Sequence, residues 1–168
     1  RPRLADLACG TLIRDRPVLS LGYGWALLDV GELEASEARL QDAESWLDTP
    51  ADKIVVVDKV QFRSLPASIA TARAYRSLAL GDLTGAEKHA QQALELTPED
   101  DQVRYTQAVS LLGVAQYASG DLPAAERSLV DFLAYLHQTG NIRTMIGITF
   151  LLADIRVALG RLRAAESI

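Results

Sequence analysis

The chain has very few of the residues that build disulfides, metal centres or nucleic-acid surfaces. Cys9 is the single cysteine among 168 residues, which excludes an intramolecular disulfide and a thiolate metal cluster. We expect it to be a small, inert thiol. Lysine and arginine total 17 against 22 aspartates and glutamates, for a net charge of −5. Because nucleic-acid affinity comes mostly from clustered basic side chains, we expect no DNA contact by this part of the protein.

Aromatic residues and long apolar runs are scarce as well. Aromatic residues make up 6% of the chain and hydrophobic residues 49%, so the core must consist largely of Ala, Leu and Val. Small side chains of this kind suit closely approaching helices. No apolar run approaches the roughly 18 residues of a membrane span, and no signal peptide is recognisable. We therefore expect no membrane contact, a cytoplasmic location and one domain over residues 1–168.

What the chain does have is a repeated phrase. GDLTGAEK begins at Gly81 and GDLPAAER at Gly120, and weaker copies, GELEASEA and GRLRAAES, begin at Gly31 and Gly160. The steps between these glycines are 50, 39 and 40 residues. A catalytic motif is normally written once, whereas a phrase at a fixed period indicates a repeated structural unit.

Each copy of the phrase is typical of the junction in a helix hairpin. Apolar residues recur three and four positions apart on both sides of it. The glycine is predicted to end the first helix in a left-handed conformation. Asp82 and Asp121 are predicted to cap the second helix, and Pro123 falls in its first turn. On that face of the second helix we expect Ala125 to be buried and Ala124 to point outward.

The apolar spacing predicts nine helices. They are expected near 3–14, 17–30, 33–48, 66–80, 83–96, 101–119, 122–138, 142–159 and from 162 onward. The stretch 49–66 is irregular and accounts for the long first step. An apolar linker lying over the helices is the preferred interpretation there, and an extra short helix is the alternative.

From Gly81 onward the chain resembles a tetratricopeptide repeat. Gly81, Ala86, Ala93 and Pro98 fall at the spacing of that repeat's glycine, two alanines and proline. The period near 40 is longer than the standard repeat of about 34 residues. The resemblance implies an all-α, right-handed solenoid of stacked antiparallel helix hairpins, with junctions near 31, 81, 120 and 160.

The whole chain also resembles the helical sensor region of LuxR-type, MalT-like bacterial transcription regulators. The stretches that carry this resemblance are RPVLSLGYGWALLDVGELEASEARLQDAESWL, FRSLPASIATARAYRSLALGDLTGAEKHAQQALEL and the hairpin phrases GDLPAAE and GRLRAAE. It implies a fragment of a larger protein with a nucleotide-hydrolysing module, a winged-helix segment and a separate helix-turn-helix domain that contacts DNA. The fragment would be a non-catalytic module that receives a small-molecule inducer or a protein. The alternative is an independent tetratricopeptide adaptor that binds a peptide, and self-association is left open.

No catalytic, cofactor or metal site is expected. The chain lacks a G-x-x-x-x-G-K-[ST] phosphate loop, and Gly22-Tyr23-Gly24 begins a dinucleotide fingerprint that Leu27 breaks. His89 and His137 are the only histidines and lie in different repeats. Glutamates recur at one repeat position, at residues 87, 126 and 166; we expect them to form salt bridges on helix surfaces or between repeats. The acidic run 99–101 is expected to cap a helix.

The best candidate binding site is the concave face that the first helix of each hairpin would line. Aromatic and polar residues on these helices form the candidate set, and they are expected to present a continuous apolar stripe to a ligand or partner. The set comprises Trp25, Thr71, Tyr75, Gln107, Ser110, Tyr117, Phe150 and Asp154.

Overall fold

The computed structural model describes residues 16–47, 49 and 59–166, and the following statements refer to these. They are 83% helical and contain no strand, which confirms the all-α class. The helices are α2 (Pro17–Asp29), α3 (Leu33–Glu44), α4 (Lys59–Arg63), α5 (Leu65–Ala79), α6 (Leu83–Leu96), α7 (Gln102–Ser119), α8 (Leu122–Thr139), α9 (Ile142–Ala158) and α10 (Leu162–Glu166).

The expected helix map holds within a few residues over most of this length. The helix expected near 33–48 ends earlier, at Glu44, and the helix expected from 66 begins at Leu65. Within the irregular stretch 49–66, residues 59–63 form α4, so the short-helix alternative is correct for that part. The helix expected over 3–14 and the rest of the irregular stretch lie outside the described residues.

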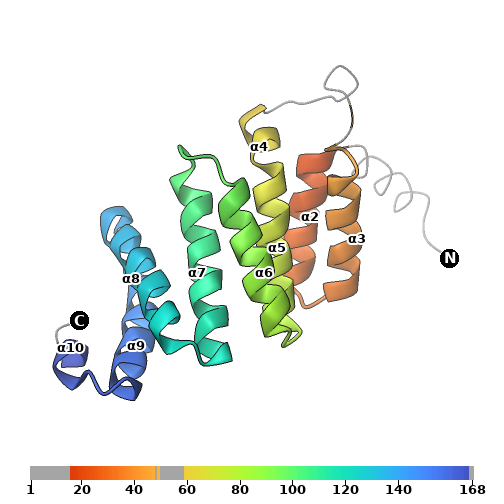
Figure 1. Cartoon of the computed structure of the whole chain (residues 1–168). Coiled ribbons are helices and arrows are strands. Elements are labelled where there is room, and N and C mark those ends of the chain that lie inside the picture. The colour runs from red at the N-terminus through yellow and green to blue at the C-terminus, as the bar shows by residue number, and fades with distance from the viewer. Residues whose placement is uncertain (1–15, 48, 50–58, 167–168) are drawn as a thin grey trace.

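The helices pack in adjacent pairs that stand in a row (Figure 1). We call α2/α3, α5/α6, α7/α8 and α9/α10 the first to fourth hairpins, and the earlier helix of each pair its first helix. The first helix α5 contacts both helices of the first hairpin, and α7 contacts both helices of the second. In the fourth hairpin α9 packs mainly on α8. The first helices of the first three hairpins therefore lie side by side.

The repeated phrase forms the junctions as expected. The glycines at 31, 81, 120 and 160 all have positive φ, between 74° and 88°, which favours a residue without a Cβ. Asp82 caps α6 by accepting a hydrogen bond from the Gly85 amide at 2.9 Å, and Asp121 caps α8 from the Ala124 amide at 3.1 Å. Each hairpin thus turns on one left-handed glycine and, in these two, one capping carboxylate.

The two helices of a hairpin meet through residues of complementary size. A Cβ added to Gly24 would lie 3.2 Å from Leu40 Cδ2, and one added to Gly113 would lie 2.8 Å from Leu129 Cγ. Both pairs join a residue seven positions before the junction glycine to one nine positions after it. In the second hairpin the same two positions hold Ala74 and Ala90, each fully buried. Glycine opposite leucine and alanine opposite alanine are two ways of filling a similar space.

The expectation that Ala124 points outward is wrong. Ala125 is fully buried as expected, but Ala124 is only 7% exposed. The reason is that α8 packs against α7 on one side and α9 on the other. Two faces of this helix are therefore covered, and adjacent residues in its first turn are both enclosed.

Candidate functional site

A groove of about 450 Å³ crosses the first helices of the first three hairpins. Helices α2, α5 and α7 form its walls, and Gln61 of α4 closes part of it. The lining residues are Val18, Leu21, Gly22, Trp25, Gln61, Ser68, Thr71, Val103, Arg104 and Gln107. A cavity of this volume is in the range that holds small ligands.

One wall of the groove is apolar and centres on Trp25. Its ring lies 5.9 Å from the ring of Tyr75, centroid to centroid, at an interplanar angle of 55°. Both residues stand six positions before their junction glycines. Because adjacent first helices run side by side, equivalent positions meet, and the two rings form a tilted aromatic pair. Leu21 and Val18 extend this wall by about two turns toward the start of α2.

The opposite wall is polar and is fixed by Arg104. Its Nη1 donates to Asp101 Oδ2 at 2.7 Å, and its Nε donates to Ser68 Oγ at 2.8 Å. Ser64 Oγ donates to the same Asp101 oxygen at 3.0 Å. These bonds tie the start of α7 to the start of α5, so the guanidinium is held in place at the groove before any ligand arrives.

Asp101 balances the charge of this wall. Burial raises the pKa of its carboxyl group, but the hydrogen bonds from Arg104 and Ser64 and the nearby positive charge outweigh burial and lower the pKa overall. The carboxyl is therefore ionised at neutral pH. Together Asp101 and Arg104 carry no net charge, so this wall offers hydrogen-bond donors without a strong preference for anions.

Gly22 keeps the groove open on the side of α2. A Cβ at this position would meet no heavy atom within 4 Å. The glycine is therefore not required for packing between helices, unlike Gly24 two residues later. Any larger side chain at residue 22 would project into the groove rather than into a neighbouring helix.

The structure brings together half of the predicted site residues. Trp25, Thr71 and Gln107 line the groove, and Tyr75 contacts Trp25. Ser110, Tyr117, Phe150 and Asp154 are not among the lining residues. Tyr117 lies near the end of α7, and Phe150 and Asp154 belong to α9 in the fourth hairpin. The continuous stripe of four rings is therefore limited to one ring pair.

The prediction missed part of the lining for an identifiable reason. The predicted set aligns the repeats only approximately: it places Tyr117, three positions before its junction glycine, with Trp25 and Tyr75, which stand six positions before theirs. Leu21 and Thr71 both stand ten positions before that glycine, and Val18, Ser68 and Gln107 stand thirteen before it. Counting positions back from each junction glycine could have identified these residues from the sequence. Gln61 and Arg104 do not share this spacing from a junction glycine. Gln61 lies on α4, which stands outside the hairpins, and Arg104 lies at the start of α7.

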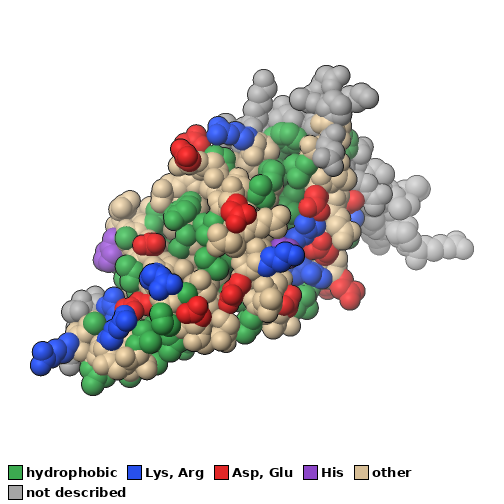
Figure 2. Space-filling view, viewed as in Figure 1, with side chains coloured by type: hydrophobic (Ala, Val, Ile, Leu, Met, Phe, Trp, Pro, Cys, Tyr) green, Lys and Arg blue, Asp and Glu red, His purple; other side chains and the backbone are tan. Residues whose placement is uncertain are grey.

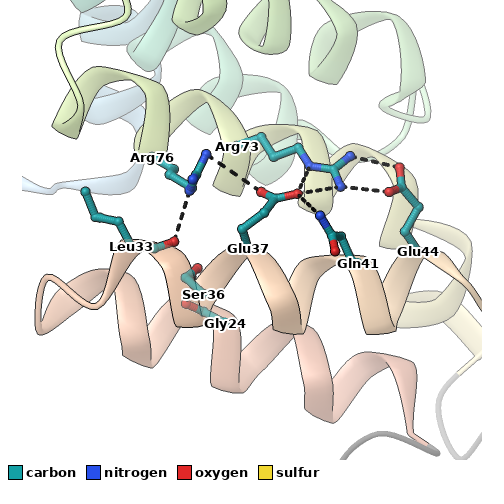
Figure 3. Close-up of polar contacts among 8 residues, drawn as sticks. All are labelled: Gly24, Leu33, Ser36, Glu37, Gln41, Glu44, Arg73 and Arg76. Atoms are coloured by element: carbon teal, nitrogen blue, oxygen red, sulfur yellow. Dashed lines mark hydrogen bonds and ion pairs between the residues drawn. The ribbon is translucent and has the colours of Figure 1, made fainter.

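A second polar cluster lies away from the groove, between the first and second hairpins (Figure 3). The guanidinium of Arg73 lies between two carboxylates of α3, at 3.0 Å from Glu37 and 2.7 Å from Glu44. Arg76 Nε donates to the Leu33 carbonyl at 3.0 Å. The hydrogen bond from Arg73 lowers the pKa of Glu44, and the same contact raises that of Arg73.

The recurring glutamate has the same role in the other hairpins. Glu87 accepts a hydrogen bond from Ser119 Oγ at 2.7 Å, and Glu126 pairs with Arg156 at 2.9 Å and with Arg161. Glu37, Glu87 and Glu126 all stand six positions after a junction glycine. The expected salt bridge between repeats is confirmed for Glu126, whereas Glu87 makes its link through a hydrogen bond to Ser119. Glu37 is a further member, with Arg73 as its partner. These carboxylates hold hairpins together.

Charges elsewhere are mixed. Figure 2 shows acidic and basic side chains interspersed over the visible face rather than gathered into a basic patch. Within residues 16–47, 49 and 59–166, no three His, Cys, Asp or Glu side chains are grouped so that they could hold a metal ion. In the same part of the chain, every helix is too short or too polar to cross a membrane.

No family model, curated protein or solved structure matches this chain. Among the lining residues Arg104 is the one charged side chain, and Asp101 neutralises it. The arrangement can bind a ligand through stacking and hydrogen bonds.

Proposed function

We propose that this chain is a non-catalytic sensing module that binds a small molecule in the groove of α2, α5 and α7. In this proposal its hairpins are tetratricopeptide-like repeats of about 40 residues that stack into a right-handed solenoid, and the groove lies on the concave side. The module would be the sensor region of a LuxR-type, MalT-like transcription regulator, with DNA contacted by a separate domain. The observation that carries the proposal is the groove, because three separate repeats contribute to it.

The two walls indicate what the ligand is like. Trp25 and Leu21 provide an apolar surface for a ring or a compact aliphatic body. Gln107 and the anchored Arg104 provide hydrogen-bond donors on the other side. A ligand that spans the groove would contact all three hairpins at once. Binding would then stabilise their relative arrangement, which is how a sensor can pass a signal along a row of repeats.

Tryptophan emission offers the test. The only other tryptophan, Trp46, is replaced by phenylalanine, and metabolites are screened for a change in Trp25 emission. A hit should fail to bind the variant Gly22→Phe, because the new ring fills the groove while its Cβ meets no neighbour. Ala38→Phe is the matched control, since Ala38 is exposed on α3, which does not line the groove. Equal binding by both variants would contradict the proposal.

A tetratricopeptide adaptor that binds a peptide is the second candidate. It is favoured by Tyr75, which is 39% exposed beside Trp25 and could carry an extended ligand beyond the groove. Tyr75→Ala should then weaken binding of a peptide but leave a ligand confined to the groove largely unaffected. The reading frame around these residues separates the two as well, because the regulator requires a phosphate loop upstream and a helix-turn-helix downstream.

A further inference from the structure

Two hydroxyl groups in the groove have already used their only hydrogen. Thr71 Oγ1 donates to the Ala67 carbonyl at 2.8 Å. Ser68 Oγ donates in the same way to the Ser64 carbonyl at 2.9 Å. Both residues line the groove, and both hydrogens are used within α5 or at its start. Thr71 and Ser68 therefore offer a ligand oxygen lone pairs and no donor.

The free hydrogen-bond donors of the groove come from α7. Arg104 uses Nε for Ser68 and Nη1 for Asp101. Among the residues that the structure describes, its Nη2 and the side-chain amide of Gln107 have no hydrogen-bond partner. A guanidinium nitrogen only donates, whereas an amide both donates and accepts. The groove thus combines free donors from α7 with free acceptors from α5.

A ligand group that both accepts and donates matches this combination. An amide or a lactam has a carbonyl oxygen for Arg104 and an N–H for Thr71 or Ser68. A carboxylate has only acceptors, so its second oxygen would meet the hydroxyl lone pairs with no hydrogen between them. An acceptor that loses water without gaining a donor costs free energy. The apolar wall at Trp25 accommodates the ring that carries such a group.

Asp101 removes the positive charge that would otherwise attract a carboxylate. Its Oδ2 accepts hydrogen bonds from Arg104 Nη1 and Ser64 Oγ, and its Oδ1 accepts one from the Arg104 backbone amide at 3.2 Å. As the cap of α7 it also offsets the partial positive charge at the start of that helix. Asp101 is not a lining residue, so it acts on a ligand through its charge and through the position it gives Arg104.

The segment around Asp101 has an excess of negative charge. Residues 99–104 carry three carboxylates and one guanidinium. Asp100 pairs at 3.7 Å with Arg63 of α4, and both side chains are exposed. Glu99 is exposed and forms no ion pair in the described part of the chain. A carboxylate ligand at Arg104 would approach this acidic excess and be repelled by it.

We propose that the groove selects uncharged ring compounds with an amide-type donor and acceptor, and that Asp101 sets this preference over carboxylates. The inference rests on the proposed small-molecule site and names the class of ligand that this site takes. Asp101 is a positioning residue in this scheme. It fixes Arg104 as a neutralised donor, and the hydroxyls of α5 supply the acceptors.

A matched pair of compounds tests the preference at pH 7. Naphthalene carboxamide and naphthalene carboxylate, substituted at the same ring position, share a shape and differ in charge and in N–H donors. Saturation-transfer NMR titrations with the whole chain measure both dissociation constants. The amide should bind the wild type at least about tenfold more tightly than the carboxylate. Asp101→Asn leaves Arg104 without its counter-charge, so it should tighten binding of the carboxylate about tenfold.

Asp100→Asn is the matched control. It makes the same change in net charge one residue away, at a carboxylate that is exposed and paired with Arg63. Because an exposed charge is screened by water, the ratio of the two dissociation constants should stay as in the wild type. Circular dichroism melts show that each variant remains folded.

Gly22→Phe separates this inference from the groove itself. It should abolish binding of both compounds, because the new ring fills the groove. If it does so, but the wild type binds both compounds equally or Asp101→Asn and Asp100→Asn shift the ratio alike, the inference is overturned and the groove stands. Binding that Gly22→Phe leaves unchanged would contradict the groove as well. If neither compound binds, the ligand class is wrong, and the metabolite screen remains the test of the groove.

Discussion

Two contacts between neighbouring hairpins occupy equivalent places in the row but are held together differently. We call the contact between the first and second hairpins the first junction and that between the second and third hairpins the alanine junction; neither is the turn at a junction glycine. Between the first and second hairpins, large aliphatic side chains pack together, among them Leu40, Leu65 and Ile69, and Arg73 adds two carboxylate contacts. Between the second and third hairpins the buried cluster consists of Ala70, Ala93 and Ala108. The repeat position of the linking glutamate is the same in both, yet its partner changes from an arginine to a serine.

The comparison shows that the repeat determines which positions of neighbouring hairpins meet, but not which kinds of side chain stand at those positions. A junction of large side chains is vulnerable to the loss of volume, because its neighbours cannot fill a cavity. A junction of alanines is vulnerable to added volume, because its helices lie close together. Both junctions contain a carboxyl group of lowered pKa, Glu44 at the first and Asp101 at the second, so both should lose stability in acid, but only the first should lose it through Arg73.

The largest effect is expected from removing volume at the first junction. Leu65 is fully buried in the large cluster, so Leu65→Ala should lower the free energy of unfolding by about 3 kcal/mol. Leu80→Ala is the control, since Leu80 is 54% exposed and should change stability little. Urea denaturation midpoints measure both. Similar midpoints for the two variants would mean that Leu65 is not in a rigid core.

Much of this fold could be predicted from the sequence because its signals are local. Junction glycines, capping aspartates and apolar spacing are each visible within about ten residues of sequence. At Gly81 and Gly120 all three predict the end of one helix and the start of the next, as the structure has it. The burial of Ala124 could not be predicted in this way. It depends on how the first turn of α8 packs against its neighbouring helices, which apolar spacing within α8 does not specify.

The candidate site was less predictable because it depends on register across hairpins. Trp25 and Tyr75 meet since both hold the same place relative to their glycines. Tyr117 holds a different place and does not line the groove. Arg104 was missed because its place in the groove depends on Ser68 of the neighbouring hairpin, a contact 36 residues away that no local pattern indicates.

A smaller effect is expected from adding volume at the alanine junction. Ala93 is fully buried between the second and third hairpins, so Ala93→Leu should lower the free energy of unfolding by about 2 kcal/mol through overpacking. Ala38→Leu, at an exposed position of α3, should be close to neutral. If Ala93→Leu were neutral or stabilising in urea titrations, the junction would contain free space and the contrast with the first junction would fail.

The smallest effect concerns Arg73 and should depend on pH. Arg73→Gln should cost about 1 kcal/mol at pH 7, because a side chain that is only 19% exposed loses two carboxylate partners. Hydrogen bonding to Arg73 lowers the pKa of Glu44 below its ordinary value of 4.5. As pH falls, the unfolded chain therefore binds a proton at Glu44 before the folded chain does. The stability that the Glu44–Arg73 contact contributes is fully present above pH 4.5 and is lost as pH falls through the lower pKa of the folded state.

Wild type and Arg73→Gln should consequently differ most near neutral pH and converge in acid. Part of the acid loss should persist in the variant, because the lowered pKa of Asp101 depends on Arg104 and not on Arg73. Urea midpoints measured from pH 7 to about pH 3 give both curves, and Lys88→Gln on exposed α6 surface controls for the change in net charge. A constant gap between the curves at every pH would show that Arg73 acts by packing alone. The ionic difference between the two junctions would then have no energetic consequence.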